Sequence, residues 1–83
     1  MVVHTVPIHG VCPINDKFDY YWLEVRTEAF IAAEQVEDFA DHVRGRRLTQ
    51  EQMAQKLRQL FPPTCQLHLS GQHGQNVRTS VVV

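Results

Sequence analysis

Two stretches near the N-terminus alternate between apolar and polar residues. The first runs from Val2 to Ile8 and is rich in valine, and the second runs from Asp19 to Ala29. A period of two residues places alternate side chains on opposite faces of a strand, so both stretches are predicted to be β-strands. Between them, Gly10 to Phe18 contains Gly, Pro, Asn and Asp and predicts a loop. One face of the second strand is predicted to carry Tyr21, Leu23, Val25 and Ala29.

Beyond residue 30 the hydrophobic period becomes three to four residues, which indicates helices. Apolar residues at this spacing run from Ala33 to Val43, and Gly45 follows where a helix typically ends. Thr49 is the predicted N-cap of a second helix, and Gln52 completes a capping box with it. The pair Pro62-Pro63 ends this helix, because a proline nitrogen has no hydrogen to donate.

Alternation returns at Cys65, Leu67 and Leu69, so a third strand is predicted there. Residues 71–76 read as a hairpin loop, and residues 77–83 as the last strand. The predicted order is therefore β-β-α-α-β-β in one domain spanning residues 1–83. This order predicts an α+β fold, with a four-stranded antiparallel sheet and both helices on one face.

Composition and length narrow the class of protein further. Apolar residues make up 43% of the chain, as in a globular domain, and none of their runs approaches the roughly 18 residues of a membrane span. The sequence has no secretory-signal pattern and only two cysteines, Cys12 and Cys65, so we expect a reducing cytoplasmic location and no membrane partner. No metal site is expected either, because the spacing of His9 and Cys12 leaves the remaining ligands undefined.

Charge is unevenly divided along the chain. Residues 1–41 hold eight acids and two bases, a net charge of −6, whereas residues 42–83 hold one acid and six bases, a net charge of +5. The simpler explanation is complementarity within the chain or between subunits. The alternative is an anion or RNA contact formed by Arg44, Arg46 and Arg47.

The second predicted face of the sheet carries aromatic residues that the helices would not cover. Tyr20 and Trp22 belong to this face. A large exposed apolar face is unusual for a monomer, so we expect a second subunit to cover it and the protein to form a homo-oligomer.

Cys12 and Asp19 are the candidate chemical groups, because they lie in and beside the first predicted loop. A thiol attacks as the thiolate and needs a base or a positive environment, and an aspartate acts as acid or base when its surroundings permit. Each residue also has a structural explanation. Cys12 would then be a small buried apolar residue, and Asp19 a strand-start carboxylate bonded to backbone amides.

The spacing of these two residues resembles a known catalytic segment. The pair Cys12-Pro13 is followed, after five further residues, by Asp19 and then by an aromatic residue. This arrangement is similar to the catalytic segment of the 7-cyano-7-deazaguanine (nitrile) reductase family of the queuosine pathway. That family has the tunnelling fold, whose unit has the β-β-α-α-β-β order predicted above. The resemblance implies that Cys12 is the nucleophile, forming a covalent thioimide with the nitrile, and that Asp19 is the general acid. It also implies a ring of subunits with sites between them.

Two helix motifs of that family differ here. Its Glu-Ser-Lys-Ser-Leu-Lys-like stretch, used for the nicotinamide cofactor, matches Ala32-Ala33-Glu34-Gln35-Val36-Glu37. Acidic residues suit cofactor phosphates poorly, so we expect no cofactor and no NADPH dependence. The Phe-His-Glu motif of that family matches Leu48-Thr49-Gln50 here. This match leaves Gln50 or Glu51 to bind a purine edge. Trp22 is a candidate for stacking on the ring.

In what it keeps and loses, the sequence is similar to the reductase-like amidinotransferases of archaeosine formation. Those relatives act on the nitrile in tRNA and use ammonia in place of hydride. The resemblance therefore favours an amidine-forming enzyme acting on a deazapurine, either free or carried by tRNA. Two alternatives stay open: a non-catalytic oligomer that binds a purine or pterin ring, and a diverged NADPH-dependent nitrile reductase.

Overall fold

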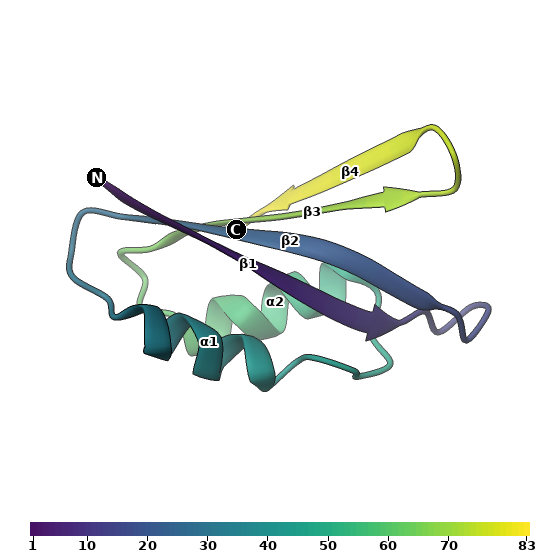
Figure 1. Ribbon diagram of the computed structural model, residues 1–83, viewed down its shortest axis with the longest axis horizontal. Coiled ribbons are helices and arrows are strands. Elements are labelled where there is room, and N and C mark those ends of the chain that lie inside the picture. The colour runs from purple at the N-terminus through teal and green to yellow at the C-terminus, as the bar shows by residue number, and fades with distance from the viewer.

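A computed structural model describes all 83 residues, 1–83, and has the predicted α+β architecture (Figure 1). The four strands form one antiparallel sheet in the order β1-β2-β3-β4, and both helices lie on one of its faces. The element order β-β-α-α-β-β is thereby confirmed. The elements are β1 (Val2–Val11), β2 (Phe18–Thr27), α1 (Ala33–Asp41), α2 (Gln50–Leu60), β3 (Gln66–His73) and β4 (Val77–Val82).

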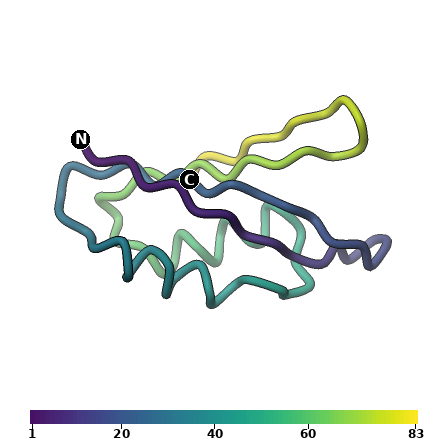
Figure 2. Tube along the Cα trace, in the orientation of Figure 1, coloured from purple at the N-terminus to yellow at the C-terminus, as the bar shows by residue number.

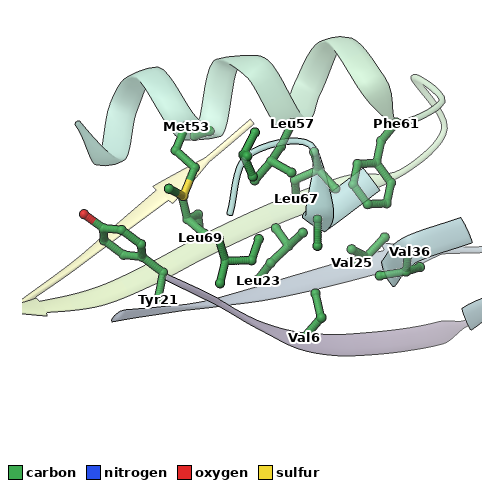
Figure 3. Close-up of a cluster of buried hydrophobic side chains, with 14 of the residues drawn as sticks. Val6, Tyr21, Leu23, Val25, Val36, Met53, Leu57, Phe61, Leu67 and Leu69 are labelled. Carbon is green, nitrogen blue, oxygen red and sulfur yellow. The ribbon is translucent and has the colours of Figure 1, made fainter. Parts of the chain in front are cut away.

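The core fills the space between the sheet and the helices (Figure 3). Leu23 lies at its centre, opposite Val6 on β1 and Leu69 on β3. Alternate residues of the strands point inward to meet the apolar sides of α1 and α2, as the two hydrophobic periods predict. The fully buried large side chains include Ile8, Leu23, Val25, Val43, Met53, Leu57, Leu67 and Leu69.

The start of α2 has the predicted cap. The Thr49 side-chain hydroxyl accepts a hydrogen bond from the Gln52 amide at 3.2 Å, and the Gln52 side chain accepts one from the Thr49 amide at 3.0 Å. These two bonds satisfy amides that the helix itself leaves free. At the other end, Phe61 has an extended backbone and the two prolines follow.

Three boundaries predicted from the pattern were wrong. β1 continues to Val11, three residues past Ile8. β3 continues to His73, because Gly71 pairs with Tyr21 on one side and with Thr79 on the other, so the hairpin loop is only residues 74–76. Ala29 lies outside β2 and is exposed. Thr27 takes the inward position instead, and its hydroxyl bonds to the backbone of residue 29.

Three connections gather at one end of the sheet (Figure 2). They are the β1–β2 loop, the connection from α1 to α2, and the β3–β4 hairpin. Antiparallel pairing places the loops of alternate connections at the same end, which brings segments from three distant parts of the sequence together. None of the helices has the length and apolar character needed to cross a membrane.

The face of the sheet away from the helices carries the aromatic residues that the pattern placed there. Tyr20 is 71% exposed and Trp22 is 51% exposed. Neighbouring β2 residues alternate between this face and the core, so Tyr21 points inward while Tyr20 and Trp22 point outward. Coverage of this face by another subunit remains a prediction.

Truncation of Leu23 to alanine should remove about 2–5 kcal/mol from the free energy of unfolding, because it leaves a cavity at the centre of the core. Chemical denaturation measures the loss. Phe30→Ala is the matched control, because Phe30 is 92% exposed and its truncation should change the stability by less than about 0.5 kcal/mol. Equal losses in the two variants would contradict the described core.

Candidate active site

A pocket of about 160 Å³ lies at this end of the sheet, between the β1–β2 loop, the start of α2 and the end of β3. We call it the Cys12 pocket. It brings together four of the residues singled out from the sequence, Cys12, Asp19, Gln50 and Glu51. The first two come from the β1–β2 region and the last two from the first turn of α2. Its complete lining is Cys12, Pro13, Ile14, Asp19, Tyr21, Thr49, Gln50, Glu51 and His73.

Cys12 is held in a tight turn between β1 and β2. Its amide donates to the Lys17 carbonyl at 2.9 Å, and its carbonyl accepts from the Asp16 amide at 2.9 Å. Asp16 has a φ of 58°, a left-handed conformation that aspartate tolerates better than most residues. The turn leaves Cys12 half-buried and Cys65 fully buried, and both are free thiols. Of the two, only Cys12 lines the pocket.

The connection between the helices is fastened to this turn. The Val11 amide donates to the Arg46 carbonyl at 3.0 Å. The Arg47 guanidinium then donates to the Pro13 carbonyl at 2.9 Å and forms an ion pair with Asp16 at 2.8 Å. In the structure Arg47 holds the turn that carries Cys12, and its predicted RNA or anion contact stays a prediction.

Asp19 is positioned by Tyr21, two residues along the same strand. The Tyr21 hydroxyl donates to Oδ2 of Asp19 at 3.2 Å. Figure 3 shows the Tyr21 ring at one end of the core, with its hydroxyl directed away from the apolar side chains. This placement requires glycine at position 71, because a Cβ there would lie 2.3 Å from Cδ1 of Tyr21.

The protonation of Tyr21 follows from its surroundings. Burial raises the pKa of the phenol, and the negative charge of Asp19 and the hydrogen bond to it raise that pKa further, with smaller effects from Cys12 and Glu51. Tyr21 therefore keeps its proton and acts as a hydrogen-bond donor toward Asp19 at neutral pH.

Gln50 is buried and anchors the pocket wall. Its Nε2 donates to the carbonyls of Leu69 and Thr79, both at 2.9 Å, so both amide hydrogens are used. This fixes the amide orientation and turns Oε1 toward Nε2 of His73 at 2.7 Å. Because Oε1 is an acceptor, Nε2 of His73 carries a proton. Gln50 was predicted to bind a purine edge, but its N–H groups are already bonded to the sheet.

Glu51 and Trp22 have different places relative to this pocket. Glu51 is exposed at the rim of the Cys12 pocket. Of the two residues predicted to bind a purine edge, Gln50 and Glu51, it is therefore the one whose side chain is free to contact a ligand. Trp22 lies on the opposite face of β2, in a separate hollow with Pro7 and Tyr20. Within one chain, the structure therefore separates Trp22 from Cys12 and Asp19.

Arg44, Arg46 and Arg47 do not form one free cationic cluster. Arg44 forms ion pairs with Glu37 and, at 2.6 Å, with Asp41, and it donates to the Pro7 carbonyl at 2.8 Å. Its hydrogen bond to Glu37 is the main cause that raises the pKa of Arg44. Arg47 is engaged with Asp16, as described above, and Arg46 alone has no acidic partner. These pairs fit charge complementarity within the chain.

Sequence reasoning missed Tyr21, Thr49 and His73 as pocket residues. Tyr21 was assigned to the core and Thr49 to the helix cap, and each has that role as well. His73 was placed in a hairpin loop, and only the longer β3 brings it beside Gln50. No group of three or more His, Cys, Asp or Glu side chains in the chain is arranged to hold a metal ion.

Comparison with known proteins finds a likeness among solved structures. No family model matches the sequence, and no curated protein matches it. Among solved structures, the chain is similar to the crystal structure of the archaeosine synthase QueF-Like in the apo form, with a TM-score of 0.77 and 21% sequence identity. The match covers 99% of this chain and 89% of that one. The chain has the tunnelling fold. The fold inferred from the resemblance of the sequence is thereby confirmed.

Replacement of Gln50 by glutamate should destabilise the protein by about 1–3 kcal/mol or more. The change removes both donors from the Leu69 and Thr79 carbonyls and buries a carboxylate against them. Thermal or chemical unfolding measures the loss. Gln55→Glu, on the exposed side of the same helix, should be nearly neutral. An unchanged stability in Gln50→Glu would contradict the described hydrogen bonds.

The Tyr21 phenol should make the stability depend on alkaline pH. In the unfolded chain it ionises near pH 10, whereas in the fold its raised pKa keeps it protonated to a higher pH. The free energy of unfolding should therefore fall as the pH rises above about 10, since the unfolded state releases the proton first. Denaturation of Tyr21→Phe at the same pH values is the control, and this variant should lose less stability. Identical pH profiles would contradict the raised pKa.

Proposed function

We propose that this chain is a cytoplasmic enzyme that acts on the nitrile group of a 7-deazaguanine, in the chemistry of queuosine- or archaeosine-type tRNA modification. The single observation that carries the proposal is that Cys12 and Asp19 line one pocket together with the free carboxylate of Glu51. The pocket thus offers a nucleophile, a proton donor and an acceptor for ring N–H groups. The free state of both cysteines agrees with a reducing compartment.

The first proposed step is addition of the thiol to the nitrile. The Asp19 carboxylate accepts the thiol proton, and the Cys12 sulfur forms a bond to the nitrile carbon. One π bond of the nitrile breaks, and its electron pair moves to nitrogen, which takes the proton back from Asp19. The product is a covalent thioimide that contains all atoms of the thiol and the nitrile. Tyr21 orients Asp19 for both proton transfers through its hydrogen bond.

The second proposed step is release by ammonia. Ammonia adds to the thioimide carbon, the carbon–sulfur bond breaks, and the sulfur leaves with a proton, so the product is an amidine. Hydride transfer from NADPH is the alternative fate of a thioimide. The stretch that matches the reductases' cofactor motif carries Glu34 and Glu37 on α1, and Glu37 is paired with Arg44. The residues of this stretch offer no cation that could bind the cofactor phosphates, so they do not fit NADPH. We therefore favour ammonia as the group that releases the product from Cys12.

A homo-oligomeric ring with sites between subunits is part of this proposal. The Cys12 pocket lies at one end of the sheet, and Glu51 at its rim is exposed. A neighbouring subunit seated on this end would close the pocket and exclude water, which strengthens electrostatic interactions inside it. The uncovered face of the sheet with Tyr20 and Trp22 supplies apolar area for such contacts.

That same face favours the second candidate function, a non-catalytic module that binds a purine or pterin ring. Tyr20, Trp22 and Pro7 line an open hollow of about 500 Å³, and exposed aromatic rings stack on planar heterocycles. Ligand binding by such a module would not depend on Cys12, because the hollow and the thiol lie on different faces of the molecule.

Incubation with 7-cyano-7-deazaguanine, or with RNA that carries it, should add the ligand mass to the protein in intact mass spectrometry. Cys12→Ala should give no adduct, and Cys65→Ala should react like the wild type because Cys65 is buried away from the pocket. Asp19→Asn should form the adduct about 10²–10⁴-fold more slowly, since proton transfer is lost. An adduct in Cys12→Ala, or none with either ligand, would contradict the proposal.

A further inference from the structure

His73 lines the Cys12 pocket, and its hydrogen bond fixes which ring nitrogen carries the proton. None of the other histidines of the chain lines this pocket. Nε2 of His73 donates to Oε1 of Gln50 at 2.7 Å, and the Gln50 amide is itself held by its two bonds to the sheet. The proton of the neutral imidazole is therefore on Nε2, and Nδ1 carries the lone pair.

Nδ1 of His73 has no hydrogen-bond partner within the chain and is open to solvent. The ring makes a single hydrogen bond, the one from Nε2 to Gln50. The residue is half-buried at the end of β3, and the one buried side-chain nitrogen or oxygen without a partner is Nε2 of His68. A lone pair that is accessible and unpartnered at a pocket can accept a proton from a ligand bound there.

The charges around the Cys12 pocket favour a small cation as a second ligand. The lining contains the carboxyl groups of Asp19 and Glu51 and no lysine or arginine, and the nearby Arg47 is paired with Asp16. Charges of one sign in a cleft raise the local concentration of ions of the opposite sign. Ammonium, the form of ammonia that predominates in neutral solution, is such a cation, but it has no lone pair with which to attack carbon.

The second proposed step needs a base of its own, because Asp19 is already engaged. In the first step Asp19 returns its proton to the nitrile nitrogen, so it faces the new imide N–H group. Its Oδ2 also accepts a hydrogen bond from the Tyr21 hydroxyl. His73 comes from a different strand and lies beside the same tyrosine, with 6.3 Å between the two ring centroids. An imidazole is the side chain best suited to accept and return a proton at neutral pH.

From these observations we propose that His73 is the base that converts bound ammonium into ammonia in the Cys12 pocket. This deepens the proposed function, on which it rests, by giving its second step a residue from outside the Cys12–Asp19 segment. Nδ1 takes one proton from ammonium, and the lone pair freed on nitrogen forms the bond to the thioimide carbon.

The proton held by His73 leaves with the sulfur. After the addition, one proton moves from the attacking nitrogen to the imide nitrogen. The carbon–sulfur bond then breaks, its electron pair goes to sulfur, and His73 gives its proton to Sγ of Cys12. Ammonium and the thioimide thereby yield the protonated amidine and the free thiol, with no further reactant.

The test measures formation and release of the adduct separately. The wild type and His73→Gln are loaded with 7-cyano-7-deazaguanine, free or carried by RNA. Ammonium chloride is then added, and intact mass spectrometry follows the loss of the adduct. Glutamine keeps an N–H group for Oε1 of Gln50 but has no nitrogen lone pair that accepts a proton. His73→Gln should form the adduct at the wild-type rate and release it about 10²–10⁴-fold more slowly, the usual contribution of a general base.

Hydroxylamine is the matched nucleophile, because it is mostly unprotonated at neutral pH and needs no base to expose its lone pair. It should release the adduct of His73→Gln at close to the wild-type rate. His42→Gln is the matched variant, since His42 is an exposed histidine at the end of α1 and outside the pocket, and it should behave like the wild type in both steps. His73→Asn is a second variant for which we expect the same result as for His73→Gln.

Equal release by ammonium in the wild type and in His73→Gln would overturn the role of His73 and leave the proposed nitrile addition intact. An equal slowing with ammonium and with hydroxylamine would also overturn it, because His73 would then only shape the pocket. Absence of an adduct in the wild type would overturn the proposed function, and the role of His73 with it.

Discussion

The first turn of α2 is joined to the sheet by the buried amide of Gln50. Its two N–H groups bond to the Leu69 and Thr79 carbonyls, and its oxygen accepts from His73. A buried amide left without partners costs about 1–3 kcal/mol, so this arrangement permits only one position of α2 relative to β3 and β4. The placement of Glu51 follows directly, because it is the next residue on the helix. The part of the Cys12 pocket that α2 forms therefore depends on this one side chain.

Local patterns predicted the elements well, because each element is encoded by its own period. The Thr49 cap and the alternation around Leu23 are properties of a few adjacent residues, and the structure confirms both. Pairings between distant segments were not predictable in this way. Gly71 was assigned to a loop because glycine often marks turns, whereas its role is to make room for the Tyr21 ring on the neighbouring strand. The extension of β3 that follows brings His73 to the pocket.

The same holds for the candidate site: features of residues close in sequence were predictable, and contacts between distant segments were not. Cys12 and Asp19 were found because they lie in and beside one loop at a characteristic spacing, and the structure places both in one pocket. The three arginines were grouped because they are close in sequence. Their partners lie on other elements: Arg44 meets acids of α1, and Arg47 meets the Cys12 turn. Of the three, only Arg46 has no acidic partner, and it lines a groove together with Lys56 of α2, a pairing that no local pattern indicates.

The tunnelling fold hosts several functions, so the decisive evidence must come from the Cys12 pocket itself. A crystal structure of the protein soaked with 7-cyano-7-deazaguanine tests the central claim most directly. We expect continuous electron density between Sγ of Cys12 and the former nitrile carbon, with Asp19 within hydrogen-bond distance of the imide nitrogen and Glu51 at the ring edge. A ligand stacked on Trp22 over the open face of the sheet, with Cys12 unmodified, would contradict the account and favour the non-catalytic module.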